Sequence, residues 1–206
     1  MKPKLIAFVG ICAFLCGCVT PQQRAPAFLS PDFNPQSVDN IALLPVLIAP
    51  GLSTDSTVTH WVHAQAAGVL KYQRKYPFTL LTNPSLVEPL TSLGSPEKLA
   101  AALPTFKPPI SQRWVLVFCL LDADTATAFG PAYDPTGTVR PYIVSGAHAL
   151  MAAFLIDTRE GRVVWNDIKP AETSGSPGVW VDMTPTMKRM AIEMTVVITL
   201  RTLPRP

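Results

Sequence analysis

Runs of apolar residues predict the strands of a central sheet. Val38–Ile48 and Trp114–Leu121 are apolar almost throughout. Continuous apolarity is typical of a strand that is covered on both faces. Phe78–Leu81 is predicted as a short strand of the same sheet. These apolar runs therefore predict a central sheet whose two faces are both buried.

A hairpin follows in the second half of the chain. Tyr142–Asp157 mixes apolar and polar residues along a long predicted strand, and Arg162–Trp165 is its predicted partner. The sequence Thr158–Gly161 between them is typical of a tight turn. Ala171–Gly178 is predicted as a loop.

Two longer segments have the three-and-four spacing of helices. Thr54–Lys75 is predicted as the first helix, and Thr184–Leu203 as the last, with Thr184 as its cap and Pro185 in the first position. In the last helix Lys188, Thr195 and Thr199 mark the polar face. Its predicted buried face consists of Met187, Met190, Ala191, Met194, Val197 and Ile198.

Two short helices are predicted between these elements, at Pro84–Leu93 and Pro96–Leu103. The order is strand, helix, strand, helices, strand, hairpin, helix. It predicts one α/β domain at 38–203, with a mixed sheet of about five strands and helices packed on its faces.

One long segment carries no regular pattern. Asp122–Pro141 contains Gly and Pro at several positions and is predicted as an irregular excursion between two strands. Loops of this length are uncommon in compact domains unless they are used. Aromatic and Arg residues are enriched at binding hot spots. We therefore predict a partner-binding site at Phe129, Tyr133, Arg140 and Tyr142, with ordinary loop packing as the alternative.

The amino terminus has the pattern of a signal peptide. Lys2 and Lys4 precede an apolar run from Leu5 to Leu15, which is too short to span a bilayer. The tetrapeptide Leu15-Cys16-Gly17-Cys18 resembles the lipobox of bacterial lipoproteins. That resemblance implies cleavage after Gly17 and acylation of Cys18, so 1–17 is the signal peptide. The alternative is an ordinary secretory signal.

The lipobox resemblance also implies a location. Val19 follows the cysteine, and in the enterobacterial sorting rule a residue other than Asp there implies the outer membrane. The protein would face the periplasm and hold to the membrane through its lipid anchor. Residues 18–37 then form a lipidated tether, rich in proline and extended like polyproline II. Phe28, Leu29 and Phe33 are expected to dock on the domain.

Composition and charge exclude a nucleic-acid partner. The 17 Lys and Arg stand against 14 Asp and Glu, and loss of Lys2 and Lys4 with the signal leaves 15 against 14. A nucleic-acid footprint needs clustered cations. Of the four cysteines, Cys119 alone remains besides Cys18, and it is predicted as a buried apolar residue.

The candidate chemistry is sparse. His60 and His63 are three residues apart, as metal ligands on a helix can be, but no third ligand is evident. Asp122 and Asp124 follow a central strand and are predicted as caps or turn formers. No nucleophile, phosphate or dinucleotide motif is present. The sequence thus predicts no catalytic residue, no metal site and no cofactor.

Two further motifs carry a second resemblance. Val38–Pro45 reads Val-x-x-Ile-Ala-x-Leu-Pro, and Asp157–Trp165 reads Asp-Thr-x-x-Gly-x-Val-Val-Trp. The domain resembles the group that contains the curli-secretion lipoprotein, the lipoprotein activators of penicillin-binding proteins and the amino-terminal domain of TolB. This implies assembly or partner binding at the outer membrane.

The sequence therefore predicts a non-enzymatic envelope lipoprotein that binds or positions another cell-envelope protein. The alternative is a homo-oligomer that serves as an outer-membrane secretion assembly. An envelope hydrolase is the weaker alternative, because it needs a nucleophile with a positioned base.

Overall fold

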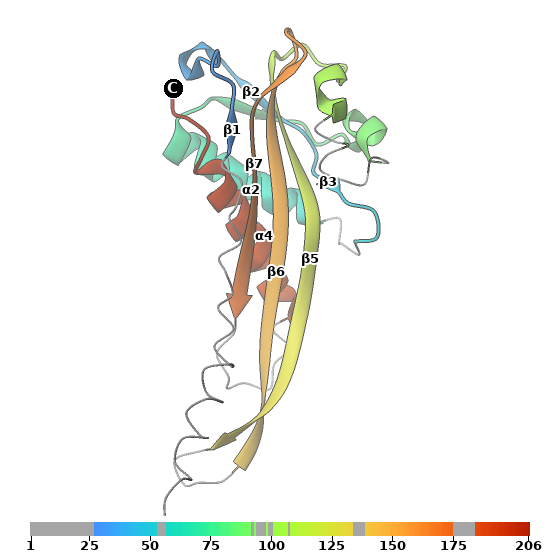
Figure 1. Ribbon diagram of the computed structural model, residues 1–206, viewed down its shortest axis with the longest axis vertical. Coiled ribbons are helices and arrows are strands. Elements are labelled where there is room, and N and C mark those ends of the chain that lie inside the picture. The colour runs from blue at the N-terminus through green and yellow to red at the C-terminus, as the bar shows by residue number, and fades with distance from the viewer. Residues whose placement is uncertain are drawn as a thin grey trace, which may run out of the picture.

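The structure is a computed structural model, and it describes residues 27–52, 57–91, 93, 98, 101–106, 108–133, 139–174 and 184–206. Within these residues seven strands form one sheet (Figure 1). The strands are β1 (Phe28–Leu29), β2 (Ile41–Leu43), β3 (Leu47–Ile48), β4 (Phe78–Leu80), β5 (Trp114–Tyr133), β6 (Val139–Asp157) and β7 (Arg162–Ser174).

The sheet is mixed. Its order is β1-β7-β6-β5-β2-β4, and β3 pairs with β5 beyond the end of β2. Strand β2 runs parallel to β4 and β5, whereas β5, β6 and β7 are antiparallel. The predicted α/β class and single domain are confirmed, with seven strands in place of about five.

Helices cover one face of the sheet. They are α2 (Thr57–Gly68), which continues as the π-helical turn η2 (Val69–Arg74), and α4 (Thr184–Leu200). On the opposite face lie the short 3₁₀ turns η3 (Pro84–Leu86), η4 (Glu88–Leu90) and η5 (Leu103–Thr105). Each face has its own apolar core.

Strand β5 shows why its start is apolar throughout. Leu116, Phe118 and Leu120 belong to the core under the helices, and Val115, Val117 and Cys119 belong to the core under the 3₁₀ turns. Successive residues of a strand point to opposite faces. The prediction of a doubly covered strand is confirmed. Cys119 is buried as predicted, and burial raises the pKa of its thiol to about 12.

The predicted first strand is divided. Leu44-Pro45-Val46 separates β2 from β3, because proline has no backbone N–H to donate to a ladder. A helix is present where Thr54–Lys75 was predicted to be helical, and residues 53–56 lie outside the described residues. It ends in the π-helical turn, where Lys75 adopts a left-handed conformation (φ 66°) and Tyr76 N–H donates to the Leu70 carbonyl.

The first of the two predicted short helices is wrong in type. Pro84–Leu93 forms two 3₁₀ turns in place of one helix, and Asn83 Oδ1 accepts the backbone N–H of Ser85 at the start of the first. Pro89 removes a donor from the interior of the segment, which a longer helix would need. Half of Pro96–Leu103 lies outside the described residues, and the described Lys98, Ala101 and Ala102 are helical, as predicted.

The predicted face of the last helix is partly wrong, although Met187 and Ala191 are buried as predicted. Met190 and Met194 are 48% and 37% exposed, while Ala191, Thr195 and Thr199 are fully buried. Thr195 donates its hydroxyl to the Ile192 carbonyl at 2.6 Å. A threonine whose hydroxyl is bonded inside its own helix can bury its methyl group. Because threonine carries a hydroxyl, the prediction from residue type placed Thr195 and Thr199 on the polar face, although both are buried.

The predicted irregular excursion is the prediction that differs most from the structure. Asp122–Pro141 has no loop at its start: strands β5 and β6 continue as an antiparallel ladder to the pair Tyr133↔Val139. Strand β7 likewise extends to Ser174, so the predicted loop Ala171–Gly178 begins too early. Small residues, Gly and Pro suggested a loop, because a ribbon that leaves the core need not show the period of a half-buried strand.

Part of the predicted tether is docked on the domain. Strand β1 pairs with β7 through Phe28↔Asn166 and Leu29↔Trp165. Phe33 is buried and its ring meets the Trp114 ring edge-on at 5.7 Å. The expected docking of Phe28, Leu29 and Phe33 is confirmed.

Candidate functional site

A long β-arm dominates the shape of the molecule. Strands β5 and β6 run together out of the domain, as Figure 1 shows. Strand β7 accompanies β6 as far as the pair Gly146↔Ser174. Beyond that pair, the described residues 127–133 and 139–145 pair only with each other. We call these residues the arm.

All four residues predicted to bind a partner lie on the arm. The ladder pairs Phe129 with Ile143, Gly130 with Tyr142, and Ala132 with Arg140. By the alternation of a strand, Phe129 and Tyr133 share one face of the ribbon and Arg140 and Tyr142 share the other. The four are therefore brought to one element but divided between its faces. Their side chains lie outside the described residues, so the binding role stays a prediction.

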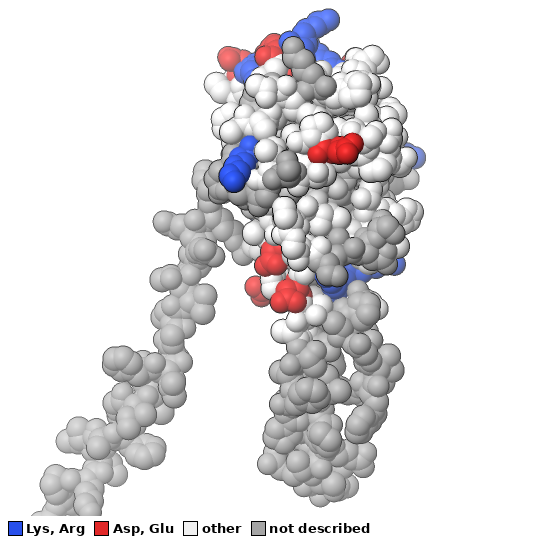
Figure 2. Space-filling view, turned by 90° about the vertical axis from the view of Figure 1, so that its right-hand side faces the viewer, with Lys and Arg blue, Asp and Glu red and all other residues white. Residues whose placement is uncertain are grey.

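Acidic residues surround a histidine at the base of the arm. His148 of β6 stands opposite Asp124 of β5 and Glu172 of β7 in the ladder. Its Nε2 lies 2.8 Å from Asp122 Oδ2. Figure 2 shows acidic side chains where the globular part meets the arm. Asp124 Oδ1 accepts the backbone N–H of the next residue, Thr125, at 2.7 Å.

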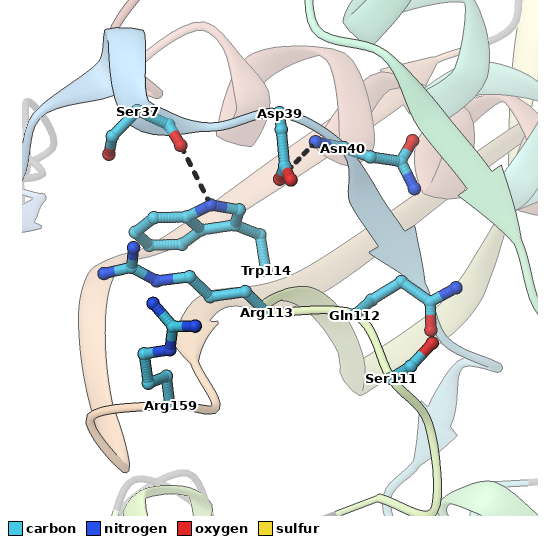
Figure 3. Close-up of a pocket in the computed structure, with 8 residues that line it drawn as sticks. All are labelled: Ser37, Asp39, Asn40, Ser111, Gln112, Arg113, Trp114 and Arg159. Atoms are coloured by element: carbon cyan, nitrogen blue, oxygen red, sulfur yellow. Dashed lines mark hydrogen bonds between the residues drawn. The ribbon is translucent and has the colours of Figure 1, made fainter.

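A polar hollow of about 420 Å³ lies at the other end of β5 (Figure 3). Arg113 and Arg159 both point into the same side of it. The Arg113 guanidinium stacks on the Trp114 ring at 4.6 Å, and Trp114 Nε1 donates to the Ser37 carbonyl at 3.3 Å. The lining residues are Ser37, Asp39, Asn40, Ser111, Gln112, Arg113, Trp114 and Arg159.

Asp157 anchors this end of the sheet. It is 1% exposed, and Arg113 donates to it from Nε at 3.1 and 3.0 Å and from Nη2 at 2.6 Å. Its Oδ1 also accepts the backbone N–H groups of Arg159 and Glu160, which closes the β6–β7 turn. Gly161 completes the turn at φ 63°.

The electrostatics of Asp157 follow from these bonds. Burial alone raises its pKa, but the Arg113 hydrogen bond, the Glu160 N–H, the Arg113 charge and the Arg159 N–H together hold the pKa below its usual 3.8. The hydrogen bond that Arg113 donates to Asp157 in turn raises the pKa of Arg113. Arg113 thus lines the hollow and also forms the ion pair with Asp157 that stabilises this end of the fold. The sequence predicted its turn at Asp157–Trp165, but Arg113 and Arg159 were missed because no local motif marks them.

The two predicted candidate histidines, His60 and His63, differ in their surroundings. His63 is buried and its Nε2 lies 2.8 Å from the Leu44 carbonyl oxygen, while His60 is exposed. Burial lowers the pKa of His63, so its ring stays neutral at pH 7. Among the residues that the structure describes, no three His, Cys, Asp or Glu side chains are placed to hold a metal ion. No described helix is long and apolar enough to cross a membrane.

Known proteins offer a likeness of fold. No family model and no curated protein matches the sequence. Similar solved structures include bacterial lipoproteins: lipoprotein GNA1162 from Neisseria meningitidis (16% identity, 68% of this chain and 87% of that one, TM-score 0.38) and a minor lipoprotein from Acinetobacter baumannii (11%, 82% and 98%, TM-score 0.37). Another is the PelC dodecamer from Paraburkholderia phytofirmans, at 15% identity over 88% of this chain and 97% of that one, with a TM-score of 0.41. At such values function has to be argued from this chain itself.

Proposed function

We propose that this protein is a lipid-anchored, non-enzymatic protein of the bacterial envelope, and that its arm binds another envelope protein. The anchor is Cys18 in the outer membrane, with the domain on the periplasmic side. The observation that carries the binding role is the arm itself: a two-stranded ribbon that continues past the end of its supporting strand.

Physical chemistry favours a partner for such a ribbon. An isolated pair of strands is marginally stable in water, and three strands or a packed face are needed for independent stability. From Thr125 to Ala147 the sequence has only Asp134 and Arg140 as charged residues, alongside Phe129, Tyr133 and Tyr142. Aromatic and Arg residues with little surrounding charge are the composition of a binding hot spot.

The unpaired strand edges favour protein in place of a small ligand. The outer edge of β5 is unpaired along the described residues 121–133, since β3 reaches only Leu120. Exposed edges accept an added strand by main-chain hydrogen bonds. The added strand can come from a different envelope protein, as the resemblance to the curli-secretion and TolB group suggests, or from a second copy in an oligomeric secretion assembly. We favour the first and treat the second as the alternative.

Lipidation is tested at Cys18. Cys18→Ser removes the only side chain that the lipobox places for acylation, so the precursor should stay uncleaved and take up no fatty acid. Metabolic labelling of cells that make either protein checks this, with Cys119→Ser as the matched control. Equal labelling of the Cys18→Ser protein would contradict the lipobox assignment.

Arm binding is tested by excision along the ladder. Ala126 and Gly146 are opposite one another, so removal of 127–145 and closure with Asn-Gly leaves a two-residue hairpin of favoured type. The shortened protein should keep its melting temperature within about 3 °C, because the removed residues that the structure describes, 127–133 and 139–145, pair only with each other. It should lose co-purification of the envelope partner from cross-linked cells.

Two outcomes of the excision would contradict this account. If the shortened protein does not fold, the arm is part of the core. If it folds and still captures the same partner, the binding surface lies elsewhere on the domain.

A further inference from the structure

Five cations gather at one end of the molecule. The last turn of the first helix carries Lys71, Arg74 and Lys75, and the residues that follow α4 carry Arg201 and Arg205. All except Arg74 are exposed. We call these five residues the cationic surface.

Direct contacts join the two halves of this surface. Arg74 Nη2 donates to the Arg201 carbonyl, and the Tyr76 hydroxyl donates to the Pro204 carbonyl at 2.9 Å. Burial lowers the pKa of Arg74, and the charges of Arg205 and Arg201 lower it further. Arg74 Nε is buried and makes no hydrogen bond within the described part of the chain. Arg74 therefore lies near enough to Arg201 and Arg205 for their charges to repel it.

The surface lacks the counter-charges found elsewhere on the domain. Arg113, Arg162, Lys169 and Arg189 each contact a carboxylate between 2.6 and 2.8 Å. Over the residues that the structure describes, none of the five cations of the cationic surface forms an ion pair, although Lys71 lies over the Tyr72 ring at 5.2 Å. Placing cations near helix carboxyl ends favours the helix dipole. The helix dipole explains the position of Arg74, which donates to the carboxyl end of α4. It does not explain why the other four cations of the cationic surface form no ion pair among the described residues.

The cationic surface lies beside the point where the tether enters the domain. Thr202 Oγ1 donates to Asp167 Oδ2 at 2.7 Å, and Asp167 follows the residue of β7 that pairs with Phe28. Figure 1 shows the carboxyl terminus beside β1. Phe28 and Leu29 of β1 are both 46% exposed. Apolar and cationic side chains thus share the region where the chain from Cys18 arrives.

The docking of β1 also shortens the tether. Only the eight residues 19–26 separate Cys18 from Ala27, the first described residue, and these nine steps along the chain span at most about 30 Å. A lipid at Cys18 therefore holds this region within about 30 Å of the membrane, or half the reach of the whole segment 18–37.

We propose that the cationic surface binds the headgroups of anionic phospholipids and so fixes how the domain stands on the membrane. The orientation rests on the proposed anchor, whereas the lipid contact itself does not. Lys and Arg close to an anionic membrane surface each strengthen binding, and the exposed aromatic and apolar residues nearby suit the interface. The contact would orient the arm relative to the membrane.

Vesicle flotation tests the lipid contact without the anchor. The chain from residue 18 onward, with Cys18→Ser and made without the signal peptide 1–17, is mixed with vesicles of phosphatidylcholine, with or without phosphatidylglycerol. The test variants reverse two exposed charges, Arg201→Glu with Arg205→Glu, or Lys71→Glu with Lys75→Glu. The control, Lys98→Glu with Arg159→Glu, changes the net charge equally at other places. Melting temperatures confirm that each variant is folded.

We expect the control to float with phosphatidylglycerol vesicles like the parent chain, and each test variant to bind at least about tenfold more weakly. Equal binding by test and control variants, or equal binding of the parent to neutral vesicles, would overturn the proposal. Binding of polyglutamate with the same charge dependence but no binding to vesicles would assign the surface to an acidic protein. Fatty-acid labelling at Cys18 is a separate readout, so failure of the anchor and failure of the lipid contact are distinguishable.

Discussion

Ala191→Asp is expected to unfold the domain or lower its free energy of unfolding by about 3–5 kcal/mol, because it places an unpaired carboxylate in the core. Ala191 is fully buried in the cluster beneath α4. For a domain of this size the loss corresponds to a fall in melting temperature of about 10 °C or more. Thermal unfolding by circular dichroism measures it.

Met190→Asp is the matched control for Ala191→Asp. It introduces the same carboxylate one residue earlier, at a side chain that is 48% exposed, and should cost less than about 1 kcal/mol. If the two variants have the same melting temperature, or if Met190→Asp is the less stable, the assigned buried face of α4 is wrong.

Asp157→Ala is expected to cost about 3 kcal/mol. It removes the partner of Arg113 and the acceptor of two turn N–H groups, and breaking such a pair costs more than the pair contributes. This free energy lies at the low end of the range for a broken buried ion pair, because the Arg113 side chain is 34% exposed and its charge is partly screened by solvent. Asp157→Asn keeps an acceptor for the turn and should lose about half as much. Denaturant unfolding at pH 7 measures both.

The pH dependence of this pair has a defined sign. Since the pKa of Asp157 is lower in the folded protein than its ordinary 3.8, its contribution is present above that value and is lost as pH falls through the folded pKa. The stability gap between the native protein and Asp157→Asn should therefore narrow in acid below about pH 3.8. A constant gap through this range would contradict the role given to the Asp157 charge.

The predictable parts of the fold are those whose pattern is set by burial. Val115–Leu120 predicts a strand covered on both faces because both its faces meet a core, and the structure has that strand. The turn at Asp157 is also predictable, since Asp and Gly carry its hydrogen bonds and its positive φ. These signals are local and physical.

The rest depended on contacts that no local pattern carries. The arm contains Gly130, Pro131 and Pro141, and its ladder comes from pairing with a strand, not from a core. The buried face of α4 includes Thr195, whose hydroxyl is satisfied inside the helix. Arg113 and Asp157 are 44 residues apart in sequence. The candidate residues on the arm were predicted from composition alone.

Photo-cross-linking from the arm tests the central claim most directly. A photoreactive phenylalanine analogue is placed at Phe129 and at Tyr142, which the register assigns to opposite faces of the ribbon, and at the control position Tyr72, which is 69% exposed on the domain. In illuminated cells we expect adducts with one envelope protein from Phe129 or Tyr142 and none from Tyr72. An adduct with that protein from Tyr72 and none from either arm position would contradict the account.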